Sequence, residues 1–184
     1  AEQLRVHSVT REYRALVYDN IREDELTIDI PIGRDERNRL RRAVNGSNPK
    51  EAVTHVKVLE RYGKYTLIAA RLETGRTHQI RVHLSHIKHP LVGDTTYGPK
   101  KQIYGLDGQL LHAKTLGFIH PSTGEYMEFD SPLPDYFKDI LERASNRQGY
   151  QRPSHDCEEQ QSPRTPGGAA SGAQRDPGIP GAGL

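Results

Sequence analysis

Four histidines crowd one segment of the chain and are its first candidates for chemistry: His78, His83, His86 and His89. Imidazole nitrogen is a common ligand of zinc, so a metal site is one interpretation. Their separations of five, three and three residues lack the i, i+4 spacing of a metal-binding helix. Cysteine is absent from this segment and carboxylates are few. We therefore expect packing or polar contacts for these histidines, and no metal.

A glycine-arginine pair just ahead of these histidines suggests a contact with an anion. Gly75 lets another chain approach closely, and free N–H groups at a following helix start attract anions. Arg76 adds a charge-assisted hydrogen bond to phosphate, although such a pair is more often a simple turn. Arg81 lies one turn into an otherwise apolar helix, so it either faces solvent or is held by a carboxylate. Spacing alone favours solvent.

A second basic stretch lies between residues 34 and 42, interrupted only by Asp35 and Glu36. Arginine pairs bidentately with phosphate, so binding to a nucleic-acid backbone is one interpretation and a solvated loop is the other. Composition leaves the two open. The arginines concerned are Arg34, Arg37, Arg39, Arg41 and Arg42.

Composition excludes several classes of protein. The 184 residues carry a formal net charge of +2, too small to prove a nucleic-acid partner. No window approaches 18 consecutive apolar residues, so we expect no transmembrane helix. The first residues lack the pattern of a signal peptide. The single cysteine, Cys157, excludes an intramolecular disulfide and favours a reducing, cytoplasmic compartment.

The composition changes near residue 147. Residues 149–184 are rich in glycine and proline and hold few large apolar side chains, so they cannot offset the entropy of ordering. We expect a folded domain at 1–147 and a disordered tail at 148–184, with no chemical role for Cys157. The chain starts at Ala1 and its only methionine is Met127. We expect that either an initiator was removed or the natural beginning is missing.

The folded part shows strand patterns first and helix patterns later. Two helices are expected, at 77–89 and 135–144, the second with Tyr136, Ile140 and Leu141 on its apolar face. A turn at 62–64 joins two strands into a hairpin, and 34–50 is expected to be a loop or mobile hairpin. The fold class is therefore α+β, with a mixed, mainly antiparallel sheet. The expected strands are 11–18, 26–30, 53–59, 65–72, 110–113 and 116–119.

The helix at 77–89 has clear signals at both ends. Thr77 is a preferred N-cap type, and Pro90 marks the end. Apolar residues recur at i, i+4 and i+7 and form a core stripe: Ile80, Leu84 and Ile87. The same period places three polar residues together on another face: His78, Arg81 and Ser85.

Read together, these segments resemble a known signature. Residues 73–84, ETGRTHQIRVHL, and 89–98, HPLVGDTTYG, closely resemble the RluA-like family of RNA pseudouridine synthases. Supporting similarity is found at 10–17 (TREYRALV), 52–55 (AVTH) and 110–113 (LLHA), and at His120-Pro121. The resemblance runs from about residue 1 to about residue 140.

The resemblance implies an activity and a site. The family isomerises uridine in RNA without a cofactor, on a nucleotide flipped out of its stack. Tyr13 would be the active-site tyrosine that stacks on the base and assists removal of the C5 proton. Arg81 would pair with the catalytic aspartate and keep it ionised. Arg76 and the 34–42 arginines would contact the RNA backbone.

One family feature is missing. The catalytic aspartate lies in a His-Arg-Leu-Asp block upstream of the tyrosine strand, and this chain has no such block. Asp19, Asp24 and Asp29 stand in no matching context, and Asp94 belongs to another block. We therefore expect the C-terminal part of a pseudouridine synthase catalytic domain, inactive alone and poorly soluble because its sheet edges are exposed.

The expected substrate is ribosomal or transfer RNA, and the intact protein is expected to be a monomer without membrane attachment. Two alternatives stay open. The first is a non-catalytic RNA-binding module of the same fold that lost its aspartate. The second is a metal-dependent hydrolase that uses His78, His83 and His86.

Overall fold

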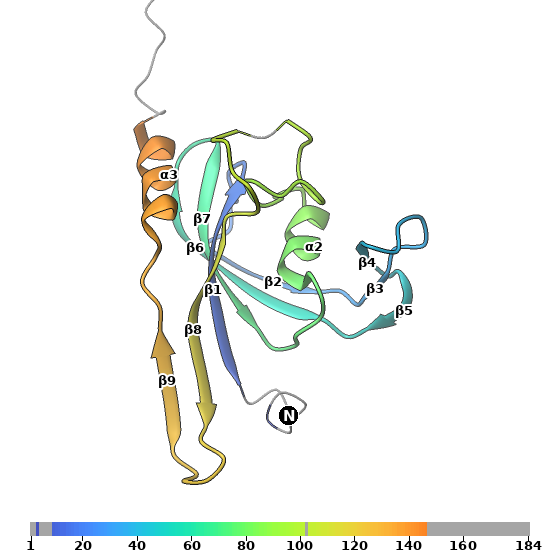
Figure 1. Ribbon diagram of the computed structural model, residues 1–184. Coiled ribbons are helices and arrows are strands. Elements are labelled where there is room, and N and C mark those ends of the chain that lie inside the picture. Colours follow the sequence, from blue (N-terminus) through green and yellow to red (C-terminus); the bar gives the residue numbers. More distant parts are fainter. Residues whose placement is uncertain (1–2, 4–8, 102, 147–184) are drawn as a thin grey trace, which may run out of the picture. The chain divides into compact units, whose positions relative to one another are not determined.

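The computed structural model describes residues 3, 9–101 and 103–146 (Figure 1). The predicted boundary near residue 147 and the predicted tail, with Cys157, lie outside these residues. No helix in the described part is long and apolar enough to cross a membrane. The strands are β1 (Thr10–Tyr18), β2 (Glu25–Asp29), β3 (Ile32–Arg34), β4 (Arg42–Val44), β5 (Ser47–Lys50), β6 (Val53–Arg61), β7 (Tyr65–Leu72), β8 (Leu111–Ile119) and β9 (Tyr126–Asp130). The helices are α2 (Gln79–His86) and α3 (Asp135–Asn146).

Six strands form the main sheet in the order β2-β6-β7-β1-β8-β9. Every neighbouring pair is antiparallel. Two of these pairs, β6–β7 and β8–β9, are hairpins closed by short turns. The expected hairpin of β6 and β7 forms around Gly63, whose φ is 71°. The α+β class and the antiparallel character predicted from the sequence are thus confirmed.

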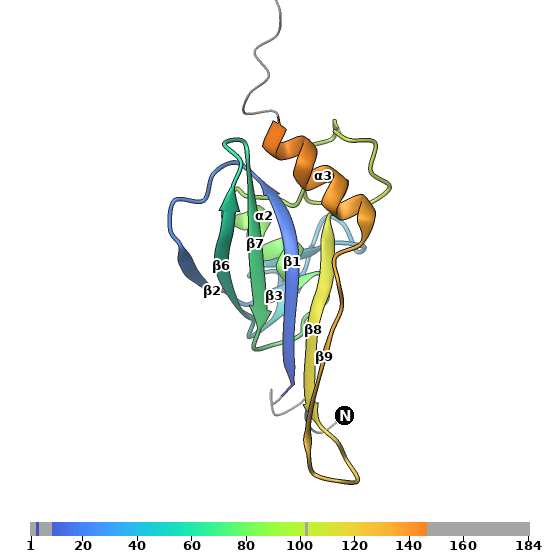
Figure 2. The ribbon, with the colours of Figure 1, turned by 90° about the vertical axis from the view of Figure 1, so that its left-hand side faces the viewer.

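The helices lie on opposite faces of this sheet, α2 on one and α3 on the other (Figures 1 and 2). Because successive strand residues point to opposite faces, β1 supplies both cores. Ala15 and Val17 pack into the cluster that contains Ile80 and Leu84 of α2. Leu16 packs into the cluster that contains Phe137 of α3.

Helix α2 is shorter than the predicted 77–89 helix. It begins at Gln79, after an N-cap His78 in the left-handed region (φ 58°), and Thr77 does not cap it. No side-chain cap is present, but the side chain of Gln79 fixes the segment before the helix, because its Oε1 accepts from the Arg76 N–H at 2.9 Å. Its Nε2 donates to the Val53 carbonyl at 2.9 Å. Buried tertiary hydrogen bonds, not the capping preference of threonine, decide where the helix starts.

Residues 34–50 were predicted to be a loop or mobile hairpin, and they contain paired strands. They complete a small antiparallel sheet in the order β4-β3-β5, which Figure 1 shows beside α2. Gly33 permits it, since a Cβ there would lie 2.5 Å from the Ser47 carbonyl oxygen. Ile32 and Val44 join Val82 of α2 in a third apolar cluster. The hairpin alternative agrees with the pairing of β3 and β4. The third strand was not predicted because this short segment is polar and depends on packing against α2.

The other end of the sheet also differs from expectation. The two strands predicted at 110–113 and 116–119 are one continuous strand, β8. The sequence analysis missed β9, an edge strand whose five residues are all exposed. A turn at Pro121–Gly124 connects β8 to β9, and the Gly124 N–H donates to the His120 carbonyl at 2.9 Å.

The predicted helix at 135–144 is present as α3, with a different buried face. Phe137, Ile140 and Ala144 are buried, whereas Tyr136 is 53% exposed. The amphipathic character was read correctly, but the stripe that faces the sheet runs through Phe137 and not through Tyr136.

These neighbouring aromatic residues allow a matched test of the packing. Truncating Phe137 to alanine removes a fully buried ring and is expected to lower the free energy of unfolding by about 3–5 kcal/mol. Truncating the exposed Tyr136 should change it by about 0.5 kcal/mol or less. Urea unfolding followed by circular dichroism measures both. Equal losses of stability would contradict the orientation of α3.

Candidate active site

A cavity of about 330 Å³ brings together the two residues predicted to be catalytic. Tyr13 reaches it from β1 and Arg81 from α2, although the two residues lie far apart in the sequence. The cavity is lined by Tyr13, Leu72, Arg76, His78, Gln79, Ile80, Arg81, Gln109 and Leu111. No carboxylate is among these lining residues.

A β-bulge in the pairing of β1 with β8 positions Tyr13. The pairing of β1 with β8 changes register between Glu12, opposite Thr115, and Tyr13, opposite Ala113. One extra residue on β8 at this point is a β-bulge, which bends the strand and redirects the neighbouring side chain. Tyr13 also packs against the core beneath α2. The tyrosine is therefore held on the cavity face by both pairing and packing.

Arg81 is held by a carboxylate and does not face solvent as spacing favoured. Its Nε and Nη2 each donate to a separate oxygen of Asp94 at 2.8 Å. The Arg81 side chain is 13% exposed and that of Asp94 is fully buried. Spacing failed because the partner comes from the loop after α2. The resemblance implied a pairing with the catalytic aspartate; in the described residues the partner is Asp94.

The loop that carries Asp94 is itself ordered around the carboxylate. Oδ1 accepts the backbone N–H groups of Thr96 and Tyr97 at 2.9 Å each. Gly93 precedes it with φ 81°, and a Cβ there would lie 2.1 Å from the Gly108 carbonyl oxygen. Burial raises the pKa of Asp94, but the Arg81 and backbone hydrogen bonds outweigh it and leave the pKa below its usual value.

Tyr97 links this ion pair to the small sheet. The guanidinium carbons of Arg41 and Arg81 each lie 5.0 Å from the centre of its ring, within cation–π range. The phenol oxygen accepts the backbone N–H of Arg42 at 2.8 Å. Sequence reasoning missed Tyr97, although it belongs to the 89–98 block on which the resemblance rests.

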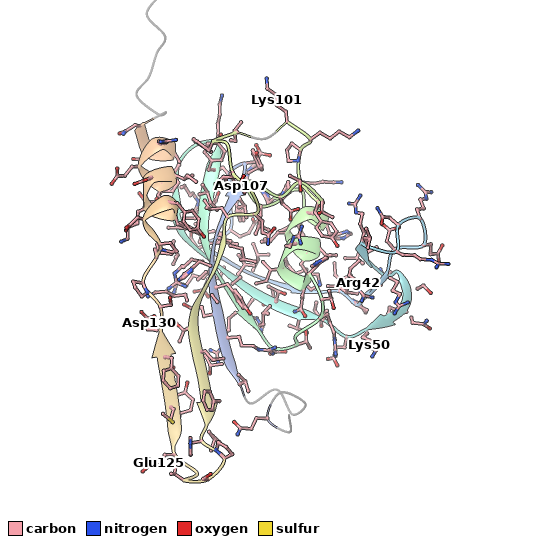
Figure 3. The ribbon with its side chains drawn as sticks, in the orientation of Figure 1. Arg42, Lys50, Lys101, Asp107, Glu125 and Asp130 are labelled. Carbon is pink, nitrogen blue, oxygen red and sulfur yellow. The ribbon has the colours of Figure 1, made fainter. Side chains whose placement is uncertain are left out.

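A second, basic cavity of about 580 Å³ lies between the small sheet and the start of α2. It gathers three of the six residues predicted to bind RNA: Arg34, Arg42 and Arg76. Lys50, which sequence reasoning missed, also lines it. Figure 3 shows Arg42 and Lys50 together on this part of the protein, far from the acidic Glu125 and Asp130 of the β8–β9 hairpin. Arg76 lines both cavities.

The three other predicted RNA-binding residues lie elsewhere. Arg37 and Arg39 are exposed on the loop between β3 and β4 and line neither cavity. Arg41 is half-buried against the Tyr97 ring. The basic stretch thus divides into residues at the cavity, residues at a loop tip and one packing residue.

The histidines do not converge on a metal. His83 is fully buried, with Nε2 donating to the Ile30 carbonyl at 2.9 Å and Nδ1 accepting from the Thr54 hydroxyl at 3.0 Å. Neither nitrogen keeps a lone pair for a ligand. Among the residues described, no three His, Cys, Asp or Glu side chains are grouped to hold a metal ion. The geometry gives the metal-hydrolase alternative no support.

Comparison with known proteins gives a consistent result. The model of the RNA pseudouridylate synthase family matches residues 1–86. An uncharacterized RNA pseudouridine synthase of Bacillus subtilis is 52% identical over 140 residues, covering 76% of this chain and 46% of that protein. Ribosomal large subunit pseudouridine synthase D of Haemophilus influenzae is 45% identical over 150 residues, covering 75% and 46% respectively.

A solved structure extends the likeness to three dimensions. Human RNA pseudouridylate synthase domain containing 1 superposes with a TM-score of 0.64 at 30% sequence identity. The match covers 78% of this chain and 68% of that one. By contrast, the chain spans about half the length of the curated relatives it matches.

Replacing Asp94 by asparagine should lower the free energy of unfolding at neutral pH by about 3 kcal/mol, because Arg81 keeps its charge and loses a buried partner. The folded pKa of Asp94 lies below its unfolded value, which is about 3.9. Its carboxylate therefore stabilises the fold above that value and loses this effect as the pH falls through the folded pKa.

Wild-type stability should accordingly fall more steeply below about pH 4 than that of the Asp94→Asn variant. Urea unfolding at a series of pH values measures both effects. The control is Asp107→Asn, at an exposed position in the loop before β8. A control variant as unstable as Asp94→Asn would argue against the role of the ion pair.

Proposed function

Since the chain belongs to the RluA-like family of RNA pseudouridine synthases, we propose that it forms part of an enzyme that isomerises uridine to pseudouridine in ribosomal or transfer RNA. One observation carries the proposal. The cavity that contains Tyr13 and Arg81 adjoins a basic cavity through the shared residue Arg76. The reacting base needs a pocket such as the cavity with Tyr13 and Arg81, and the adjoining RNA phosphates need a basic surface beside it.

The reaction breaks the bond between uracil N1 and the ribose, turns the base, and rejoins it through C5 with loss of the C5 proton. A uridine within a stacked helix is inaccessible, so the nucleotide flips into the cavity. There the ring of Tyr13 stacks on the base, and its hydroxyl assists removal of the C5 proton. No step needs a metal or a cofactor.

Arg81 acts on the charge of the catalytic carboxylate. A guanidinium beside a carboxylate keeps it ionised, as its role of nucleophile or base requires. The bidentate contact with Asp94 fixes the plane of the guanidinium, while its edge remains on the cavity. Asp94 is thus the residue that orients Arg81.

The catalytic carboxylate comes from a segment outside these 184 residues. Two observations support this part of the proposal. The cavity is lined by no acidic residue, and the curated relatives are about twice as long as the matched region. The first of these also favours the alternative, a non-catalytic RNA-binding module.

RNA reaches the site along the basic cavity. Arg34, Arg42 and Lys50 bind backbone phosphates, with Arg76 at the junction. Arg37 and Arg39 at the loop tip extend this contact. The intact enzyme works as a monomer in the cytoplasm, where ribosomal and transfer RNA are its substrates.

Charge reversal tests the RNA contact on the chain as it exists. The double variant Arg34→Glu, Lys50→Glu should weaken binding to a structured RNA at least tenfold, because two attractive phosphate contacts become repulsive. The slope of log affinity against log salt should become shallower by about 1.5, since each neutralised phosphate contributes about 0.7–0.9 to that slope. Fluorescence anisotropy across a salt series measures both.

The matched control reverses the same number of charges on the other side of the main sheet. Lys138→Glu, Arg143→Glu changes two exposed residues of α3. Its affinity should stay near that of the wild type. Equal weakening by both double variants would show that only net charge matters and would remove the proposed RNA path.

The predicted need for an outside carboxylate has its own assay. Purified chain incubated with RNA labelled with tritium at uridine C5 should release no tritium into water, because the C5 proton leaves only when the base is rejoined. The same preparation should bind that RNA. Tritium release by the 184 residues alone would refute the outside carboxylate and show that the chain is sufficient for catalysis.

A further inference from the structure

His78 belongs to the 73–84 block on which the resemblance rests, but the proposed mechanism gives it no role. It is the N-cap of α2 and lies in the left-handed backbone region, with φ 58° and ψ 19°. A non-glycine residue in this region is uncommon and persists when its surroundings determine it. No side-chain capping bond accompanies it. The backbone instead turns the imidazole toward the cavity that contains Tyr13 and Arg81.

A chain of hydrogen bonds fixes the proton on this imidazole. The Arg42 backbone N–H donates to the Tyr97 phenol oxygen at 2.8 Å. That phenol lies 2.9 Å from His78 Nδ1. Among the described residues, His78 Nδ1 is the one acceptor within reach of the phenol hydrogen, so we assign the hydrogen of this contact to the phenol. Nδ1 is therefore an acceptor, and the neutral ring carries its proton on Nε2.

The electrostatic surroundings agree with a neutral ring. Burial is the main cause that lowers the pKa of His78, and the positive charge of Arg81 lowers it further. Arg42 acts in the same direction, whereas Asp94 opposes these effects. The ring also meets Tyr97 edge-on, with 5.7 Å between the ring centres. At neutral pH His78 thus offers a neutral N–H donor.

Nε2 of His78 has no hydrogen-bond partner within the described part of the chain, and the residue lines the cavity. A neutral N–H donor suits a neutral acceptor such as a carbonyl oxygen, while the arginines serve anions. Building on the proposed function, we infer that His78 is a specificity-determining residue whose Nε2–H donates to a carbonyl oxygen of the uracil base. Tyr97 is the positioning residue that selects the required tautomer.

The proton position is testable without RNA. Nitrogen NMR of the chain labelled in histidine should show His78 as the Nε2–H tautomer at pH 7. Tyr97→Phe removes the phenol hydrogen and should produce a mixture of both tautomers, while buried His83 keeps its signals. A wild-type ring protonated on Nδ1, or one unaffected by Tyr97→Phe, would overturn the inference.

Base recognition is tested with two RNA stem–loops that differ only in carrying uridines or abasic residues in the loop. The wild-type chain should prefer the uridine loop, and His78→Leu should reduce that preference roughly five- to tenfold, the effect of one hydrogen bond. Affinity for the abasic loop should not change. His78→Gln, which keeps an N–H donor, should recover part of the preference.

The control is His86→Leu, because His86 is exposed on the same helix and does not line the cavity. It should keep the wild-type preference. A uridine preference that survives His78→Leu would overturn the role of His78 and leave the proposed function intact. Absence of salt-dependent binding to either RNA would instead contradict the proposed function. The inference about His78, which rests on that function, would then fail as well.

Discussion

The ion pair between Arg81 and Asp94 is the constraint on which the site depends. A fully buried carboxylate is tolerable only when its charge is matched and its oxygens are hydrogen-bonded, and both conditions are met here. The hydrogen bonds to Asp94 hold the loop after α2 and keep the Tyr97 ring 5.0 Å from the guanidinium carbons of both Arg41 and Arg81. Tyr97 then connects the small sheet to His78. One buried charge therefore organises Arg81, the basic cavity and the wall of the cavity that contains Tyr13.

Much of this arrangement was readable from the sequence, and the failures have physical causes. Alternation and turns predicted the central strands because β1, β6 and β7 bury strong apolar patterns. The small sheet and β9 were missed because their residues are polar or exposed, so only their neighbours make them strands. The same limit applies to α2. Thr77 is a good cap by local preference, yet the buried hydrogen bonds of Gln79 set the first turn.

The candidate site also contains residues that the sequence predicted and residues that only the fold brings together. Arg81 was predicted from the long motif at 73–84 and Tyr13 from the shorter block at 10–17, and both residues line one cavity. Spacing pointed Arg81 to solvent because helical periodicity contains no information about the loop that supplies Asp94. Arg34, Arg42 and Arg76 were grouped correctly with a basic region, whereas Lys50 joins them only through the pairing of β3 with β5. A sequence shows which residues are charged, but the fold decides which of them line the same cavity.

The bulge beside Tyr13 limits how the lengths of β1 and β8 can change. Strands repeat every two residues, so a bulge acts as a phase shift between two segments that are each in register. Tyr13 lies at this shift, and it faces the cavity because the paired segments on both sides keep their own register. A single-residue insertion or deletion in this part of β8 would change the phase and present the opposite face of one segment. A change of length is therefore tolerated in the turns and not beside the bulge, so the number of residues in this strand pair constrains the cavity as strictly as the side chains that line it.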